Sequence, residues 1–99
     1  MMRESQDKKS GGAIITVIGV DHVGITAKVC SFLAERGINI EEISQTILSG
    51  NFVMLMMVDV SKNTGQLEEL KRELDELGKS MNVSISMMHE EVFSAMHRI

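Results

Sequence analysis

Residues 14–43 read IITVIGVDHVGITAKVCSFLAERGINIEEI, and this stretch decides the fold. It opens with a β-branched, alternating run over residues 14–20, which favours a pleated strand and suits a helix poorly. Gly24 can adopt backbone angles that are closed to other residues, so the chain can reverse there. Residues 25–36 then place apolar side chains on one helical stripe, and Gly37 is a typical C-terminal stop. The stretch predicts a strand, a tight turn, a helix and a second strand.

The rest of the chain completes this pattern. The expected elements are strands over 38–48, 52–60 and 82–88 and a second helix over 66–78. A bulge is expected near Glu41 and Glu42, and a polar loop over 61–65 precedes the second helix. The order β, α, β, β, α, β is that of an α+β, ferredoxin-like sandwich, in which two helices cover one face of a four-stranded antiparallel sheet.

The second predicted helix has the clearest periodicity in the chain. Its apolar residues recur three or four positions apart, at Leu67, Leu70, Leu74 and Leu77. Opposite charges four residues apart predict exposed ion pairs between Glu68 and Arg72 and between Lys71 and Asp75. After the last strand, residues 90–99 are expected to form a helical segment that carries Val92, Phe93 and Met96 inward.

One face of the predicted sheet has no helix to cover it. The third strand is apolar on both sides, with Phe52, Met54, Met56 and Val58 on one and Val53, Leu55 and Met57 on the other. The first strand is apolar on both sides as well. A second apolar face of this size exceeds what monomers usually expose, so it predicts a partner, most economically another copy of the chain.

Length and composition limit the function classes. The 99 residues, of which 43% are hydrophobic and 24% charged, predict one domain over residues 13–99 behind a flexible arm over residues 1–12. The apolar runs are too short to span a bilayer and no signal-peptide pattern occurs, so we expect a cytoplasmic protein without membrane contact. A net charge of −4, with no basic stripe and no tryptophan or tyrosine, argues against direct nucleic-acid binding. Cys30 is expected to be a buried or half-buried thiol without chemistry.

The turn at Asp21 to Gly24 is where the chain is best equipped to hold a small ligand. The first N–H groups of the following helix have no helical partner, and such groups favour an anion. His22 adds a titratable, hydrogen-bonding ring beside that helix start. The alternative is a plain connection, in which Asp21 caps the helix and Gly24 only relieves backbone strain.

Asn39 is a second candidate for this site. It stands at the beginning of the second strand, and in this topology we expect the first two loops to approach each other at one end of the sheet. The alternative is a turn residue that tolerates an unusual backbone angle.

Metal and catalytic interpretations find less support. Nine methionines, with Met87-Met88-His89 and Met96-His97 close in sequence, suggest a soft metal ion such as copper, but methionine is also a common apolar filler. The sequence has no CxxC, no carboxylate and histidine cluster at ligand spacing, no nucleophile elbow and no glycine-rich phosphate loop. We therefore expect no enzyme activity, no cofactor and no metal.

Several segments resemble a known family. Residues 19–25, GVDHVGI, and residues 32–40, FLAERGINI, are similar to the start of an ACT domain, the small regulatory module that binds amino acids. The segments at 43–46 and 52–56 and the ending at 85–99 resemble more narrowly the stand-alone single-ACT proteins of an uncharacterised family. The likeness covers nearly all of the chain except the N-terminal arm.

This resemblance implies a dimer whose sheets or helices meet side by side, with a small ligand near the first loop and the second strand. Carried over residue by residue, the site would consist of Asp21, His22, Val23, Gly24, Ile25, Asn39 and Ile40. A ligand carboxylate would meet the N–H groups near Gly24 and Ile25, while Asp21 or Asn39 would engage an ammonium or amide group. Val23 departs from the family, since many ACT domains have proline there, and this leaves the loop freer.

Two function classes follow. The first is a ligand-sensing homodimer that regulates a separate protein partner, similar to the ACT repeats of the glycine cleavage repressor or the front end of formyltetrahydrofolate deformylase. The second is a structural interaction module whose bare sheet face docks on another protein and whose turn binds no small molecule. A shift in melting temperature with an amino acid would separate the two, because a ligand that binds only the folded state stabilises it.

Overall fold

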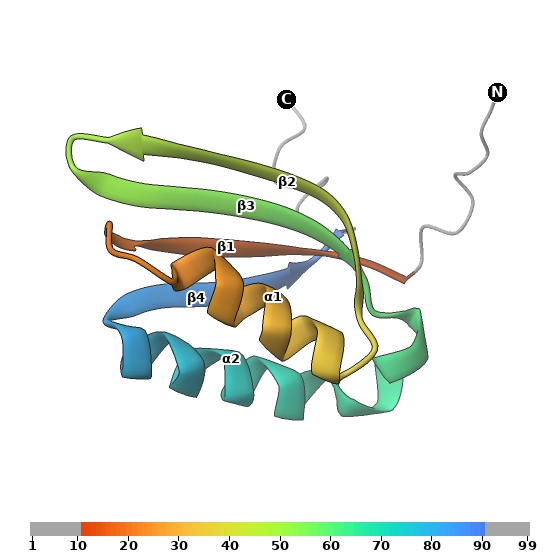
Figure 1. Cartoon of the computed structure of the whole chain (residues 1–99). Coiled ribbons are helices and arrows are strands. Elements are labelled where there is room, and N and C mark those ends of the chain that lie inside the picture. The colour runs from red at the N-terminus through yellow and green to blue at the C-terminus, as the bar shows by residue number, and fades with distance from the viewer. Residues whose placement is uncertain (1–10, 91–99) are drawn as a thin grey trace, which may run out of the picture.

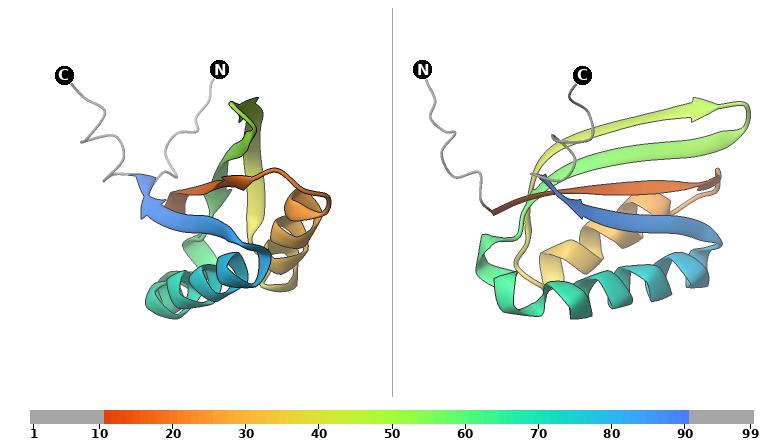
Figure 2. Two further views of the ribbon diagram at one scale, coloured as in Figure 1. Left: turned by 90° about the vertical axis from the view of Figure 1, so that its left-hand side faces the viewer. Right: turned by 180° about the vertical axis from the view of Figure 1, so that it is seen from behind.

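Figure 1 shows a computed structural model of the chain, which describes residues 11–90. Its elements are β1 (Gly12–Val20), α1 (Ile25–Glu35), β2 (Asn39–Leu48), β3 (Asn51–Asp59), the 3₁₀ helix η2 (Ser61–Gln66), α2 (Leu67–Met81) and β4 (Val83–His89). The strands form one antiparallel sheet in the order β2-β3-β1-β4. Both helices lie on the same side of it (Figure 2). The predicted ferredoxin-like βαββαβ fold is confirmed. Residues 1–10 of the predicted arm and the segment at residues 91–99 lie outside the described residues, and Gly12, predicted to belong to the arm, begins β1.

The core lies between the helices and the face of the sheet that they cover. Alternate residues of β1 and β3 point into it, and Val17 and Met54 are 0% exposed. From the helices, Val29, Leu33 and Leu74 are equally buried. The predicted helical stripes and the predicted faces of the third strand are therefore confirmed. Cys30 is half-buried against this core, as expected.

Helix α1 ends where the sequence indicates. Gly37 has φ +69°, which L side chains rarely adopt, and its N–H donates to the carbonyl of Ala34 at 3.0 Å. The N–H of Ile38 reaches back to the carbonyl of Leu33 at 3.0 Å. These two bonds satisfy carbonyl groups of the last turn and direct the chain into β2.

Helix α2 does not end at Gly78, so this part of the prediction is wrong. The helix continues to Met81 and is closed by Asn82 in a left-handed conformation, with φ +60°. Gly78 is buried, and a Cβ atom there would lie 2.7 Å from the carbonyl oxygen of Val83. The glycine is therefore required by the close approach of α2 to β4 and not by a helix stop.

Two other local expectations also need correction. Residues 61–66 form η2 and not an open loop, and the N–H of Asn63 donates to the carbonyl of Val60 at 2.9 Å. On α2, Arg72 pairs with Glu69 and Glu76, whose carboxylates raise the pKa of its guanidinium, the hydrogen bond to Glu69 contributing most. Asp75 pairs with Lys79. Two of these pairs have the predicted spacing of four residues. Each charged residue has possible partners three or four positions before and after it, and the sequence alone does not show which partner is used.

Strand β2 is the least covered element of the sheet. It forms one edge of the sheet (Figure 1), and each of its side chains except that of Ile40 is exposed. The register shifts between Ile40 and Glu42, so the bulge predicted near Glu41 is confirmed. Because β2 stands at the edge of the sheet, one side of its backbone has no strand partner among the described residues. Within the same part of the chain, no helix is long and apolar enough to cross a membrane.

Candidate functional site

The glycine turn leaves the start of α1 open. Gly24 is the N-cap residue, with φ +96° and ψ −4°, and no side chain caps the helix. The first helical bond runs from the N–H of Lys28 to the carbonyl of Gly24 at 3.0 Å. The N–H groups of the preceding turn, at residues 25–27, therefore have no helical acceptor and present partial positive charge to the outside.

The alternative interpretation, in which Asp21 caps this helix, is contradicted by the structure. The cap position belongs to Gly24, which has no side chain, and Asp21 is exposed three residues earlier in the chain. The positive φ of Gly24 confirms the need for glycine at the turn. The interpretation of the turn as a plain connection assumed a capping carboxylate, which the structure does not have. The Asp21 side chain is instead accessible beside an uncapped helix start.

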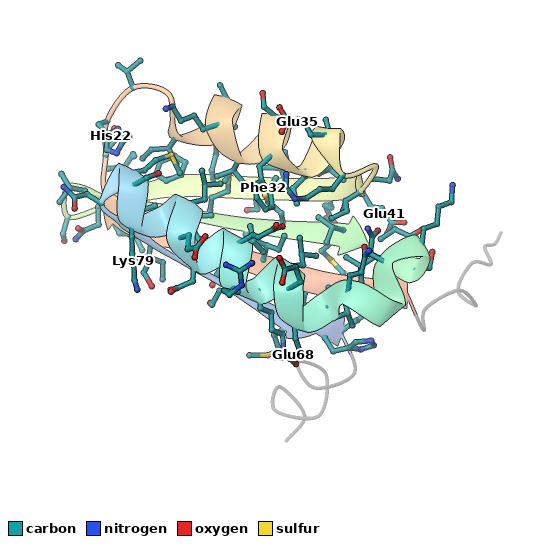
Figure 3. All side chains as sticks on the ribbon, turned by 90° about the horizontal axis from the view of Figure 1, so that it is seen from below. His22, Phe32, Glu35, Glu41, Glu68 and Lys79 are labelled. Carbon is teal, nitrogen blue, oxygen red and sulfur yellow. The ribbon has the colours of Figure 1, made fainter. Side chains whose placement is uncertain are left out.

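His22 ties the turn to the end of α2. Its Nε2 lies 2.9 Å from the carbonyl oxygen of Met81, and its Nδ1 lies 3.2 Å from the carbonyl oxygen of Val23. Carbonyl oxygens only accept, so the ring nitrogen at the shorter contact donates to Met81. Figure 3 shows His22 where the turn meets the last part of α2. The ring therefore positions the turn, although the sequence suggested that it would grip a ligand.

Thr26 and Gln45 also belong to this region, although no sequence pattern indicated them. The Thr26 hydroxyl donates to Oε1 of Gln45 at 3.2 Å and lies 3.9 Å from the sulfur of Met54. This contact joins the first turn of α1 to the middle of β2. It depends on how β2 is aligned in the sheet, which no short motif encodes. The uncapped helix start is thereby placed beside the exposed edge strand.

Asn39 and Ile40 are not brought to the turn within one chain. In the sheet, Asn39 is aligned with Asp59 and Gly12, whereas the turn follows Val20 at the other end of β1. Eight strand positions separate these ends, which is about 27 Å. Figure 3 shows the same separation between His22 and Glu41, which lie at opposite ends of the molecule. The expected meeting of the first two loops is therefore wrong, because α1 returns the chain along the sheet before β2 begins.

The remaining predicted residues differ in what they can offer. The Ile25 side chain is buried at 2% exposure, so only its backbone N–H faces the turn. Val23 is 98% exposed at the tip, and Val20 and Leu48 nearby are 68% and 59% exposed. Ile40 is half-buried against the core, and Asn39 is exposed. The turn thus combines backbone donors, an accessible carboxylate and an exposed apolar margin.

The described residues line hollows on the helix side of the molecule, of which two concern Arg36. One, of about 220 Å³, is lined by Arg36 and residues of η2 and α2, and the other, of about 360 Å³, lies along α1 with Phe32 in its wall. Arg36 lines both, but its guanidinium already bonds Glu73 at 3.0 Å and stacks on Phe32 at 3.6 Å. Its charge therefore already has a partner, and this ion pair links α1 to α2.

Only some of the candidate metal ligands belong to the described residues. Met87, Met88 and His89 are half-buried at the end of β4, and Met96 and His97 lie outside the described part of the chain. Within residues 11–90, no three histidine, cysteine, aspartate or glutamate side chains come close enough to hold an ion.

Comparison with known proteins identifies the class. The family model of the ACT domain matches residues 13–88, and the chain belongs to the ACT domain family. ACT domains are generally regulatory modules that bind small ligands. The βαββαβ order of the chain agrees with membership of this family.

The similar proteins narrow this class to single-domain members. UPF0237 proteins of Listeria innocua and Clostridium acetobutylicum are 48% and 51% identical over 87 residues, which is 88% of this chain and 98% of each relative. The structure of an ACT domain protein from Streptococcus pneumoniae matches with a TM-score of 0.76 and 38% identity, covering 83% of this chain and 92% of that one. The relatives thus form an uncharacterised family of single-ACT-domain proteins.

A more distant match shares the fold alone. Formyltetrahydrofolate deformylase from Burkholderia mallei has a TM-score of 0.71 but only 14% identity. The match covers 80% of this chain and 28% of the deformylase, so the shared unit is one part of a larger protein.

Proposed function

We propose that this protein is a regulatory module that binds an amino acid or a similar small metabolite and acts on a separate protein partner. The observation that carries the proposal is the uncapped start of α1 at Gly24, beside the exposed carboxylate of Asp21. A ligand carboxylate accepts hydrogen bonds from the open N–H groups, and a ligand ammonium pairs with a side-chain oxygen. The protein acts by binding and not by catalysis.

The ligand site is shared between two copies of the chain. Strand β2 has an open edge, and Ile43 and Ile47 on its helix side are 42% and 51% exposed. Antiparallel pairing of two such edges about a twofold axis satisfies the free backbone groups and covers these isoleucines with residues of the partner strand. The homodimer therefore has one continuous sheet with all its helices on the same side.

This pairing brings Asn39 back to the site. In an antiparallel pair of β2 strands, the first residue of one strand lies opposite Leu48 of the other, at the end of the sheet that carries the turn. Thr26 already reaches Gln45 of β2 within its own chain. The next strand is only about 4.8 Å farther away, so a small ligand at the α1 start can touch Asn39 of the second copy.

Calorimetric melting against each of the common amino acids tests the proposal, since the chain has no tryptophan or tyrosine to report on unfolding. A ligand of the folded dimer raises the melting temperature. Gly24→Ala should abolish this rise, because a left-handed φ strains alanine and its methyl group projects where the ligand binds.

Gly37→Ala is the matched control. Gly37 also has a positive φ and open space around its missing Cβ, but it lies at the far end of α1. Both variants should lose about 1–2 kcal/mol of stability, while only Gly24→Ala loses the response to the ligand. Flat curves for the wild-type protein with every amino acid would contradict the proposal and favour the interaction module.

A further inference from the structure

The face of the sheet opposite the helices carries an apolar patch bounded by hydroxyl groups. We call this the open-face patch, and it consists of Ile18, Val20, Leu48, Val53 and Leu55. The alignment of the strands places these residues side by side, with Ile18 next to Val53. Ile18 is 49% exposed and Leu55 is 36% exposed. Among the described residues, α1 and α2 both lie on the other side of the sheet (Figure 2).

Both margins of the patch carry small hydroxyl side chains. On the β2 side, the rows end at Ser44 and Thr46, and on the β4 side they end at Ser84 and Ser86. The Ser86 hydroxyl lies 2.7 Å from that of Thr16. An apolar centre with a polar rim is the usual anatomy of a protein interface.

The patch carries no charge in the three rows that run from Thr16 to Val20 across the described strands. This is unusual on a chain with 14 acidic and 10 basic residues and a net charge of −4. When identical faces meet about a twofold axis, each residue near the axis meets its own kind, so like charges there would repel. A neutral centre with similar margins on both sides removes that repulsion.

The area shows what kind of assembly this face can support. Four strands about 4.8 Å apart and five residues long give a patch on the order of 300 Å² per copy. Two such patches bury roughly 650 Å², less than the 1,200–2,000 Å² of stable interfaces. In the edge-paired dimer proposed above, two patches lie in one plane, and stacking two dimers buries about twice as much.

We infer that the open-face patch packs against the same patch of another copy, so that two edge-paired dimers assemble into a tetramer. This inference rests on the proposed dimer for its area. The occupant is a second copy because the face is neutral, apolar at its centre and alike at both margins. The tetramer is in equilibrium with the dimer, since its interface is near the lower limit for stable association.

Sedimentation velocity over a range of protein concentrations tests this assembly. The wild-type protein should pass from dimer to tetramer as its concentration rises. Leu55→Glu should raise the dissociation constant of the tetramer by about tenfold or more and leave the dimer intact, since it places like charges within the contact. Ala34→Glu, on the exposed surface of α1, is the control and should behave as wild type.

A second variant covers the case in which Leu55→Glu does not fold. Ile18→Thr keeps a β-branched residue in the strand, so it should fold and still weaken the tetramer. Wild-type protein that stays dimeric at every concentration would overturn the inference, and so would either variant if it folds and forms tetramers as wild type does.

An edge variant separates this inference from the proposed function. Ile43→Glu alters the helix side of β2 and should produce monomers that no longer respond to a mixture of the common amino acids in a melt. Leu55→Glu dimers should keep that response. If Ile43→Glu leaves the dimer intact while Leu55→Glu removes it, the open face holds the dimer itself, and both the tetramer and the edge pairing are wrong.

Discussion

The two faces of strands β1 and β3 differ in how far their apolar side chains are buried. In β1 and β3, Val17 and Met54 are 0% exposed on the helix side, whereas Ile18 and Leu55 are 49% and 36% exposed on the other. All four residues are apolar and adjacent in sequence or in the sheet. At these four positions the difference comes from the two helices, which lie on one face only. Apolar residues on the covered face stabilise the single chain, whereas Ile18 and Leu55 on the open face remain partly exposed.

The largest expected loss of stability comes from substitutions on the covered face. Leu33→Ala and Leu74→Ala each remove a fully buried side chain, so each should lower the free energy of unfolding by about 2–5 kcal/mol. Leu55→Ala on the open face should cost less than about 1 kcal/mol in dilute protein, because its side chain is already partly hydrated. Urea unfolding monitored by circular dichroism measures all three. Equal losses on the two faces would contradict the comparison.

A smaller effect tests how closely α2 covers the sheet. Gly78→Ala places a methyl group 2.7 Å from the carbonyl oxygen of Val83 and 3.1 Å from Cγ1 of Ile85, so α2 or β4 must shift. We expect a loss of about 1–3 kcal/mol in the free energy of unfolding, measured in the same way. Gly65→Ala meets no atom within 4 Å and should change stability by less than about 0.5 kcal/mol. A neutral Gly78→Ala would show that the helix lies less closely on β4.

The smallest expected effect concerns the turn between β1 and α1, which belongs to neither face of the sheet. His22→Ala removes the hydrogen bond from Nε2 to the carbonyl oxygen of Met81 and should cost about 0.5–1.5 kcal/mol. It should also speed hydrogen exchange at the start of α1, because the turn loses its tie to α2. Asp21→Ala alters an exposed neighbour that does not cap the helix and serves as the control. Unchanged exchange in His22→Ala would mean that the ring does not position the turn.

Much of this arrangement could be predicted from short-range patterns. The alternation of residues 52–58, the helical stripe of α1, the stop at Gly37 and the bulge near Glu41 all follow from local periodicity and backbone preference. Predictions from local rules failed where packing between distant segments determines the structure. Gly78 looks like a stop but serves the contact between α2 and β4.

The candidate site shows the same limit. The turn at Gly24 could be recognised because glycine chemistry is local, and its positive φ is confirmed. The place of Asn39 could not, since it depends on the length and direction of α1, and the contact between Thr26 and Gln45 depends on strand alignment. Whether Asn39 completes the site depends on a second copy, which no motif of the single chain describes.

Mixing two binding-deficient variants tests the shared site most directly. Gly24→Ala lacks the turn half of the site and Asn39→Ala lacks the strand half, so neither homodimer should bind the amino acid that stabilises the wild-type protein. After subunit exchange, half of the dimers are hybrids with one intact site each, and titration calorimetry should recover about one quarter of the wild-type sites. No recovery in a mixture shown to contain hybrids would contradict a site built from two copies.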